Sequence, residues 1–161
     1  MSKIGKQSVA ESTKSAISVL LGRYDYALDP KKRFTIPSCW RRIMGDPEDV
    51  FIVPDPEEKC LNLVPPDLMR ARIEELQKKA LLDPSLNKLL QVIGENSEQL
   101  TLDCQGRIRV CDKLLRFANL TTTVAMVGSV RLIKLWDPAA LGAGDEVDQE
   151  AFREAAKGLG F

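Results

Sequence analysis

The side chains best suited to recognition chemistry are basic residues that stand in two copies of one motif. The first copy reads LDPKKRFTIP and the second reads LDCQGRIRVC. Each has an aspartate followed four residues later by an arginine, as Asp29 and Arg33 or as Asp103 and Arg107. A guanidinium group can hold a guanine edge or a phosphate through two parallel hydrogen bonds, while lysine ammonium groups supply charge. Residues of these types indicate binding of an anion or a nucleic acid.

The two motifs belong to an internal duplication. The aspartates of the two copies are 74 positions apart, and so are the arginines. The match continues at the same offset into the following segment, where Trp40 corresponds to Leu114 and Arg42 to Arg116. With 161 residues the chain is long enough for one ordinary domain. We therefore expect two similar halves that share one core.

A turn followed by a strand is the local structure that each copy predicts. Aspartate favours the first position of a type I turn, and Gly106 suits the fourth. Past the first turn, Phe34 and Ile36 alternate with Arg33, which is the period of a strand with one buried face. The motif arginines should therefore face away from the core. Two interpretations stay open, because the aspartates need only form turns and an outward arginine can serve an ion pair.

Short apolar strands and amphipathic helices account for the rest of the chain and predict an α+β fold that is mainly β. The expected strands are 22–28, 33–36, 50–53, 60–64, 97–102, 107–110, 124–127 and 132–136, the last two joined around Gly128 and Ser129. The expected helices are 38–44 with Ser38 as its cap, a helix introduced by Pro65 and Pro66 with apolar residues recurring up to Ala80, 83–94 ended by Gly94, a short helix from Asp112, and 147–159.

The charges are balanced overall but segregated along the chain. The net charge is zero, with 23 basic and 23 acidic residues, whereas nucleic-acid-binding domains are usually basic. Both motif regions nevertheless carry an excess of basic residues, and the C-terminal tail is acidic. A solvated face is the plainer interpretation of such a cluster, but its recurrence in both copies favours a recognition surface. The candidate DNA contacts are Lys31, Lys32, Arg33, Arg41, Arg107 and Arg109.

Several classes of function are disfavoured by what the sequence lacks. It has no histidine, no nucleophile motif and no glycine-rich phosphate loop after a strand, so we do not expect an enzyme. We expect no metal site or cofactor, because its four cysteines form no C-x-x-C pair and read as buried or half-buried thiols. No apolar run approaches the roughly 18 residues that span a bilayer, and no signal peptide is visible. The expected location is the cytoplasm.

The D-x-x-x-R motif used twice, the second time as DCQGR, resembles MraZ, a family of bacterial transcriptional regulators with tandem AbrB-like repeats. Three further stretches agree with the family pattern. LLGRYDYALD is similar to its opening strand, KCLNLVPPDLM to its strand followed by a proline-led helix, and VGSVRLIKLWD to its closing hairpin that ends in Trp-Asp. The resemblance covers residues 20 to about 140.

The resemblance implies a fold, a partner and an assembly. The fold is a double-split, swapped-hairpin-like β-barrel, with a first AbrB-like repeat and bridging helix at 20–80 and a second repeat at 81–140. We expect a disordered extension at 1–19, and a loop with an amphipathic helix at 141–161. The family's first motif reads direct repeats in double-stranded DNA upstream of the division and cell-wall gene cluster, and its subunits form rings on the nucleoid. Carried over, its contacts fall on Lys31 and Arg33.

One position departs from the family pattern. A glycine usually precedes the motif arginine, as Gly106 does here, but the first copy has Lys32. If the position requires a positive φ, lysine costs about 1 kcal/mol relative to glycine. The turn and the DNA sequence preference should then differ, and Lys32 can add a phosphate contact. The alternative function is that of an oligomeric interaction protein of the same fold without specific DNA readout.

Overall fold

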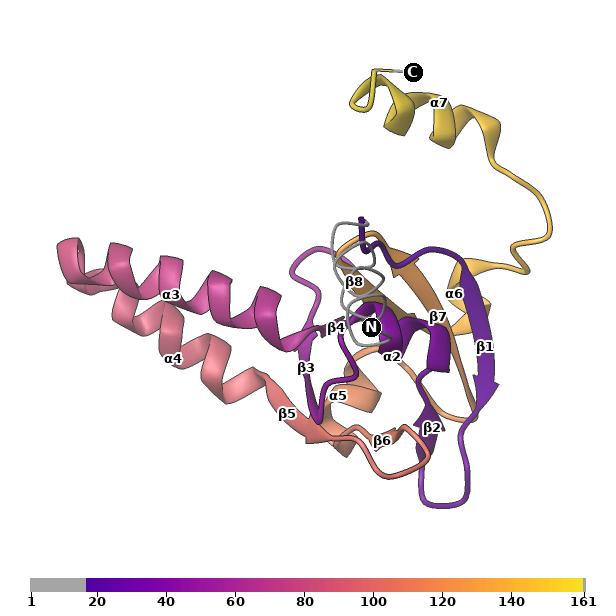
Figure 1. Ribbon diagram of the computed structural model, residues 1–161, viewed down its shortest axis with the longest axis horizontal. Helices are drawn as coiled ribbons and strands as arrows, with labels where there is room; N and C mark the ends of the chain where they lie inside the picture. The colour runs from indigo at the N-terminus through magenta and orange to yellow at the C-terminus, as the bar shows by residue number, and fades with distance from the viewer. Residues whose placement is uncertain (1–16, 161) are drawn as a thin grey trace, which may run out of the picture.

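The computed structural model describes residues 17–160, so the predicted N-terminal extension lies almost wholly outside the described residues. Within this range the chain forms an α+β fold of eight strands and six α-helices (Figure 1). The strands are β1 (Arg23–Ala27), β2 (Arg33–Thr35), β3 (Asp49–Pro54), β4 (Leu61–Val64), β5 (Glu98–Thr101), β6 (Arg107–Arg109), β7 (Thr123–Ser129) and β8 (Leu132–Trp136). The helices are α2 (Ser38–Ile43), α3 (Pro66–Leu82), α4 (Asn87–Asn96), α5 (Asp112–Phe117), α6 (Pro138–Leu141) and α7 (Gln149–Lys157), with a 3-10 turn, η1 (Pro84–Leu86), between α3 and α4.

The sheet topology displays the duplication. Six strands pair in the order β1-β7-β8-β4-β3-β5, and β2 and β6 form a separate two-stranded ribbon. All of these pairs are antiparallel. If each strand is replaced by its counterpart in the other half, the same order is obtained in reverse. An approximate twofold axis therefore passes between β8 and β4 and between β2 and β6. The strand order thus matches the internal duplication of the sequence.

The two halves exchange their first strands. β1 of the first half pairs with β7 of the second, and β5 of the second half pairs with β3 of the first. Each half is therefore completed by the other, which interlocks them. Among the described strands the sheet ends at β1 and β5 without closing, so the predicted barrel closure is not detected.

One hydrophobic core joins the sheet, the ribbon and the two short helices that follow the motifs. Phe34 and Ile108 enter it from the ribbon, and Trp40 and Leu114 from α2 and α5. The Trp40 indole donates a hydrogen bond to the carbonyl of Leu21 at 3.0 Å, so its polar atom is satisfied although the ring is buried. These contacts hold the ribbon against the body of the protein.

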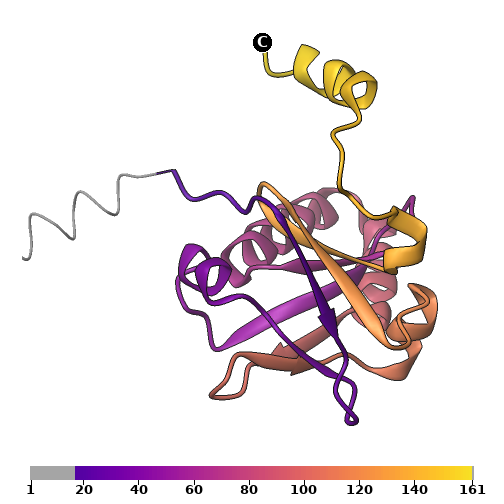
Figure 2. The same cartoon turned by 90° about the vertical axis from the view of Figure 1, so that its right-hand side faces the viewer.

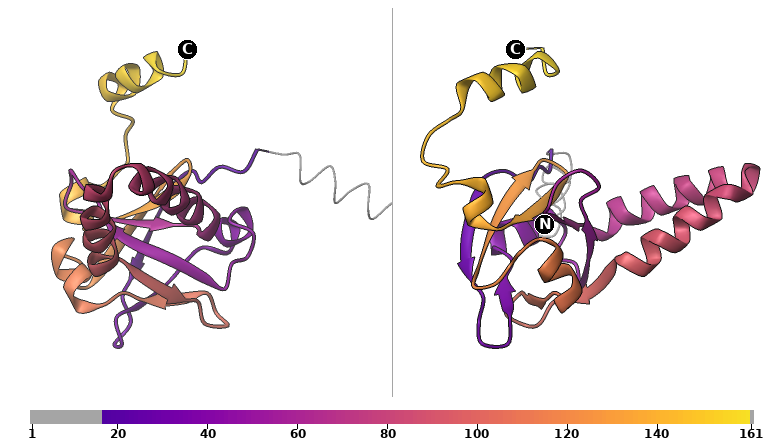
Figure 3. Two further views of the ribbon diagram at one scale, coloured as in Figure 1. Left: turned by 90° about the vertical axis from the view of Figure 1, so that its left-hand side faces the viewer. Right: turned by 180° about the vertical axis from the view of Figure 1, so that it is seen from behind.

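The helices α3 and α4 form a hairpin that projects from the sheet (Figure 1 and Figure 3). Pro66 begins α3 as predicted, and Met69 and Ala80 are buried on its inner side. The Asp83 side chain accepts a hydrogen bond from the Ser85 amide at 3.1 Å and so begins η1. Several large apolar side chains of the hairpin remain exposed to solvent: Leu81, Leu82, Leu89 and Val92.

Two helix ends differ from the prediction. Ser38 does not cap α2, because the capping position is taken by Pro37 and no side chain caps this helix. Gly94 does not end α4, which continues to Asn96. The Asn96 side chain donates to the carbonyl of Val92 at 2.8 Å and stabilises this last turn. Glycine has a low helix propensity but does not by itself end a helix. The helix α4 therefore continues past Gly94 to Asn96.

The predicted centre of the last hairpin was also wrong. The strand β7 runs through Gly128 and Ser129, and the turn lies at Val130, which has a φ of 67°. Gly128 is required by packing, because a Cβ there would lie 2.6 Å from the carbonyl oxygen of Leu20. The N-terminal segment thus crosses the strand at that glycine, and Leu20 and Val130 exchange backbone hydrogen bonds at 2.9 and 3.0 Å.

The C-terminal helix stands away from the rest of the molecule (Figure 1 and Figure 2). The helix α6 is capped by the Asp137 side chain, which also accepts a hydrogen bond from Asn119 at 3.1 Å. Residues 142–148 then lead to α7, which is shorter than the predicted helix 147–159. Within residues 17–160 we find no helix of the length and apolarity needed to cross a bilayer.

Candidate nucleic-acid interface

The ribbon of β2 and β6 carries the motif arginines on its outward face. Its central pair, Phe34 and Ile108, is buried in the core. Neighbouring residues of a strand point to opposite faces, so Arg33 and its antiparallel partner Arg109 point outward. The register thereby places a basic residue of the second repeat beside the first motif.

Each D-x-x-x-R motif closes as the same clamp. Asp29 accepts hydrogen bonds from the backbone amide and from Nε of Arg33, both at 2.7 Å. Asp103 accepts the corresponding bonds from Arg107 at 2.9 and 2.7 Å. The amide of the motif arginine, together with the adjacent guanidinium group, lowers the pKa of each aspartate below its ordinary value. The spacing of four residues therefore has a structural role in both halves.

The residue before each motif arginine adopts the left-handed conformation. Lys32 has a φ of 60° and Gly106 a φ of 76°, so the positive φ considered for Lys32 is confirmed. A side chain in this region costs about 1 kcal/mol. In the second copy the Arg41 side chain packs on this glycine, because a Cβ on Gly106 would lie 2.5 Å from the guanidinium carbon of Arg41 and would make that flexible side chain move. At the position of Arg41 the second half has Leu115, which is buried in the core.

Four basic residues gather where the first motif meets β6, and we call Lys31, Lys32, Arg33 and Arg109 the first-motif cluster. Arg109 Nε donates to the carbonyl of Lys31 at 3.1 Å. Asp112 lies between two members, with its Oδ1 3.4 Å from Lys32 Nζ and 3.5 Å from Arg109 Nη2. These three side chains are about half exposed, so the ion pairs are weak and can yield to a phosphate.

Asp112 was predicted from the sequence as the start of a helix, but not as a residue of the candidate site. It is the first residue of α5, where a carboxylate stabilises the positive end of a helix. That local signal marks a helix start, but it does not reveal that the carboxylate reaches Lys32, which is 80 residues away in the chain.

The remaining predicted contacts lie at the opposite end of the ribbon. Arg41 Nε donates to the carbonyl of Ile36 at 3.0 Å, and the Arg41 side chain covers Gly106. Together with Asp46, Glu48 and Asp103 it lines a cavity of about 390 Å³. The structure therefore places Arg41 among carboxylates and separates it from the first-motif cluster.

Arg107 shares this second end but has few basic neighbours. The two residues before it are Gln105 and Gly106, which supply no charge at the positions of Lys31 and Lys32. Its guanidinium group is held by Asp103 at 2.7 Å. The two ends of the ribbon are thus alike in backbone geometry and different in electrostatics, and the first end is the more basic.

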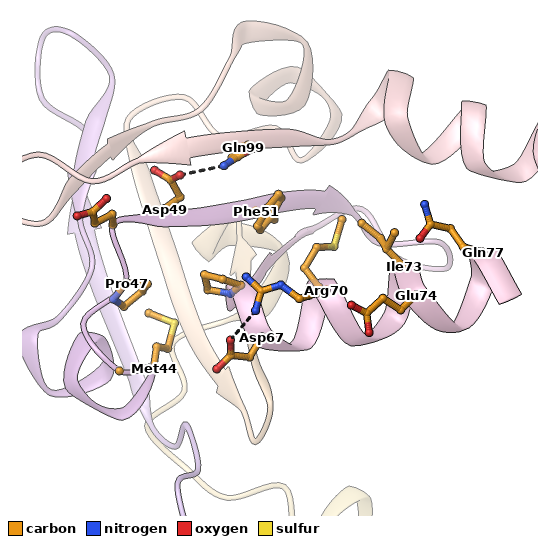
Figure 4. Close-up of a pocket in the computed structure, with 14 residues that line it drawn as sticks. Met44, Pro47, Asp49, Phe51, Asp67, Arg70, Ile73, Glu74, Gln77 and Gln99 are labelled. Atoms are coloured by element: carbon orange, nitrogen blue, oxygen red, sulfur yellow. Dashed lines mark hydrogen bonds and ion pairs between the residues drawn. The ribbon is translucent and has the colours of Figure 1, made fainter.

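A cavity of about 740 Å³ lies elsewhere, between the end of α2, β3 and the first turns of α3 (Figure 4). Phe51 and Ile73 supply apolar surface, and Asp67 pairs with Arg70 at 3.5 Å. Four carboxylates stand on its lining, those of Glu48, Asp49, Asp67 and Glu74, against the single guanidinium of Arg70. Such a surface repels a polyanion, so the first-motif cluster is the better candidate for nucleic acid. No model of a known protein family matches the chain.

Proposed function

We propose that this protein is a sequence-specific DNA-binding transcriptional regulator of the MraZ type, with the first-motif cluster as its DNA-contacting surface. One observation carries the proposal: basic side chains from both repeats converge at one end of an exposed β-ribbon. The other end of the ribbon, with the same fold, has no comparable concentration of charge. A charge pattern that the twofold symmetry does not require points to a function at the first end.

The ribbon suits the major groove of DNA. This groove admits a two-stranded β-ribbon, and arginine can bind the two acceptors of guanine there. The clamp engages Arg33 through Nε, which leaves the four N–H groups of its terminal nitrogens for a base or a phosphate. Asp29 also holds the guanidinium in one orientation, so less freedom is lost on binding. Lys31 and Lys32 supply phosphate contacts that position the ribbon.

The proposed fold within this family is the swapped-hairpin arrangement of two AbrB-like repeats. The palindromic strand order and the exchange of β1 and β5 between halves support this proposal. The proposed operator is a set of direct repeats upstream of the division and cell-wall gene cluster, which places the protein on the nucleoid.

Self-association into a ring-like homo-oligomer belongs to the same proposal. Direct repeats need several reading heads, and linked weak contacts reach a high combined affinity. The helix α4 supports association, because Leu89 is 50% exposed and Val92, three residues later, is 56% exposed. Residues three apart are neighbours on a helix surface, and exposed apolar side chains that lie side by side suggest an interaction site. A clean monomer at micromolar concentration in light scattering would contradict this part of the proposal.

An oligomeric interaction protein without specific readout is the second candidate, and the clamps favour it. The Asp103–Arg107 pair has the geometry of the Asp29–Arg33 pair although Gln105 and Gly106 replace the two lysines of the first motif. The motif therefore has a use in the fold that is independent of DNA.

A binding titration discriminates between the two candidates. The full chain is titrated with DNA from upstream of its own operon and with a shuffled duplex of the same composition, at several salt concentrations. The regulator should prefer its operator under competition, with log affinity falling by about 0.9 per log unit of salt for each phosphate contacted. Equal weak binding to both duplexes, or no binding, supports the interaction protein instead.

A further inference from the structure

The helix α7 presents an apolar stripe that no residue between 17 and 160 covers. Phe152, Ala155 and Ala156 lie on one face of this helix, and Leu159 continues the same spacing in the turn that follows Lys157. Phe152 is 57% exposed and Leu159 is 68% exposed, and the helix stands clear of the body (Figure 2). Isolated helices shorter than about 12 residues are marginal in water. A nine-residue helix such as α7 therefore needs a surface to pack on.

An apolar groove of suitable character lies at the base of the helical hairpin. It has a volume of about 540 Å³ between α4, the end of β3 and α5, and Figure 3 shows α4 and α5 near each other there. Its lining is mainly carbon, from Val53, Val92, Ile93, Leu114 and Phe117. Helix-in-groove recognition uses such a surface, with anchors at the spacing found in α7.

The charges of the groove and of α7 are complementary. Asp55 in the groove is neutralised by Lys134, at 2.7 Å. Lys113 remains on the lining, and Lys59 Nζ lies 4.6 Å from the centre of the Phe117 ring. The segment around α7 has more acidic than basic residues, namely Asp145, Glu146, Asp148, Glu150 and Glu154 against Arg153 and Lys157. Charge complementarity of this kind steers and orients association.

We propose that α7 of one copy docks in the α4–α5 groove of a neighbouring copy, with Phe152 of the helix and Leu159 of the turn that follows it as the apolar anchors. The tail is fastened to its own body through α6 by the Asn119–Asp137 hydrogen bond, and residues 142–148 carry α7 outward. Helix and groove are different surfaces, so the contact is heterologous and repeats from copy to copy until a ring closes. The inference rests on the proposed self-association and is independent of DNA binding.

Two single substitutions remove one side of the contact each. Phe152→Asp replaces an apolar anchor of α7 with a charge, and Val92→Glu places a charge on the lining of the groove. Both residues are exposed, so each variant should keep its fold and its thermal midpoint. Leu82→Glu, at the hairpin tip and outside both surfaces, is the matched control. In light scattering without DNA, the wild type and the control should show the mass of an oligomer, and the two variants should fall to a single chain.

Mixing the two variants is the decisive measurement. The Phe152→Asp chain keeps an intact groove and the Val92→Glu chain keeps an intact helix, so an equimolar mixture should form a dimer with one chain of each kind. A monomeric wild type, an unchanged mass in either variant, or a mixture that stays monomeric overturns the inference. DNA titration of the same variants reports on the proposed function separately, because Phe152→Asp leaves every residue of the first-motif cluster in place.

Discussion

Arg109 of the second repeat is the antiparallel partner of Arg33 of the first. Its Nε also donates to the carbonyl of Lys31, so the turn of one motif is supported by the strand of the other. The candidate DNA-contacting surface is therefore built from both repeats. A fragment that contained one repeat would lack it, as well as the exchanged strand that completes its sheet.

Arg33→Ala should weaken operator binding about tenfold or more, whereas Arg107→Ala should leave it nearly unchanged. Both variants lose the same clamp, at 2.7 Å in each motif, so their melting temperatures should fall by similar amounts. Arg107→Ala is thus a matched control for the structural role. Anisotropy titrations and thermal unfolding together test this prediction, and equal affinities for the two folded variants would refute the site assignment.

Lys32→Gly should stabilise the fold and reduce the salt dependence of DNA binding. Glycine relieves the φ of 60°, a gain of about 1 kcal/mol, while the lost pair with Asp112 is long and half exposed. If Lys32 contacts phosphate, the salt slope should become shallower by roughly one unit per bound subunit. Discrimination between operator and random DNA should persist, because phosphate contacts do not specify sequence. A loss of discrimination at constant slope would be inconsistent with this account.

Stability should fall in acid as the clamps lose their charge. The folded-state pKa values of Asp29 and Asp103 are lowered, so the clamps stabilise the fold fully above the unfolded-state pKa of about 3.9 and lose this contribution as pH falls through the folded values. Urea unfolding between about pH 2.5 and 6 should show that decline.

The Asp29→Asn, Asp103→Asn double variant should be less stable at neutral pH and depend less on pH in this window. Asp67→Asn, at a side chain that is 94% exposed, controls for the loss of a carboxylate. An unchanged pH profile in the double variant would show that the clamps do not stabilise the fold.

The four cysteines should react with thiol reagents at very different rates. Burial raises the pKa of the Cys60 thiol to about 11, so its thiolate fraction near neutral pH should be about a hundredfold below that of an ordinary cysteine. Cys104 is exposed in the second-motif turn, which corrects the expectation that all four are buried or half-buried. Mass spectrometry of timed labelling should find Cys104 modified first and Cys60 only after unfolding. Early modification of Cys60 in the folded protein would contradict the assigned burial.

Local features of this protein were predictable from its sequence. The duplication, the turn and strand of each motif, the positive φ at Lys32 and the proline-led start of α3 depend on the conformational preferences of neighbouring residues. The amphipathic character of α7 was visible for the same reason. These preferences act over a few residues, and a residue pattern records them directly.

The tertiary structure decided which of these local pieces meet. The pairing of β2 with β6, the exchange of β1 and β5, and the position of Asp112 between Lys32 and Arg109 all join residues far apart in the chain. A register shift of one residue would turn every side chain of the ribbon to its other face, and the sequence alone does not specify that register. The register is specified by the packing of Phe34 and Ile108 into the shared core. It thereby gathers one set of arginines into the first-motif cluster and leaves Arg41 among carboxylates.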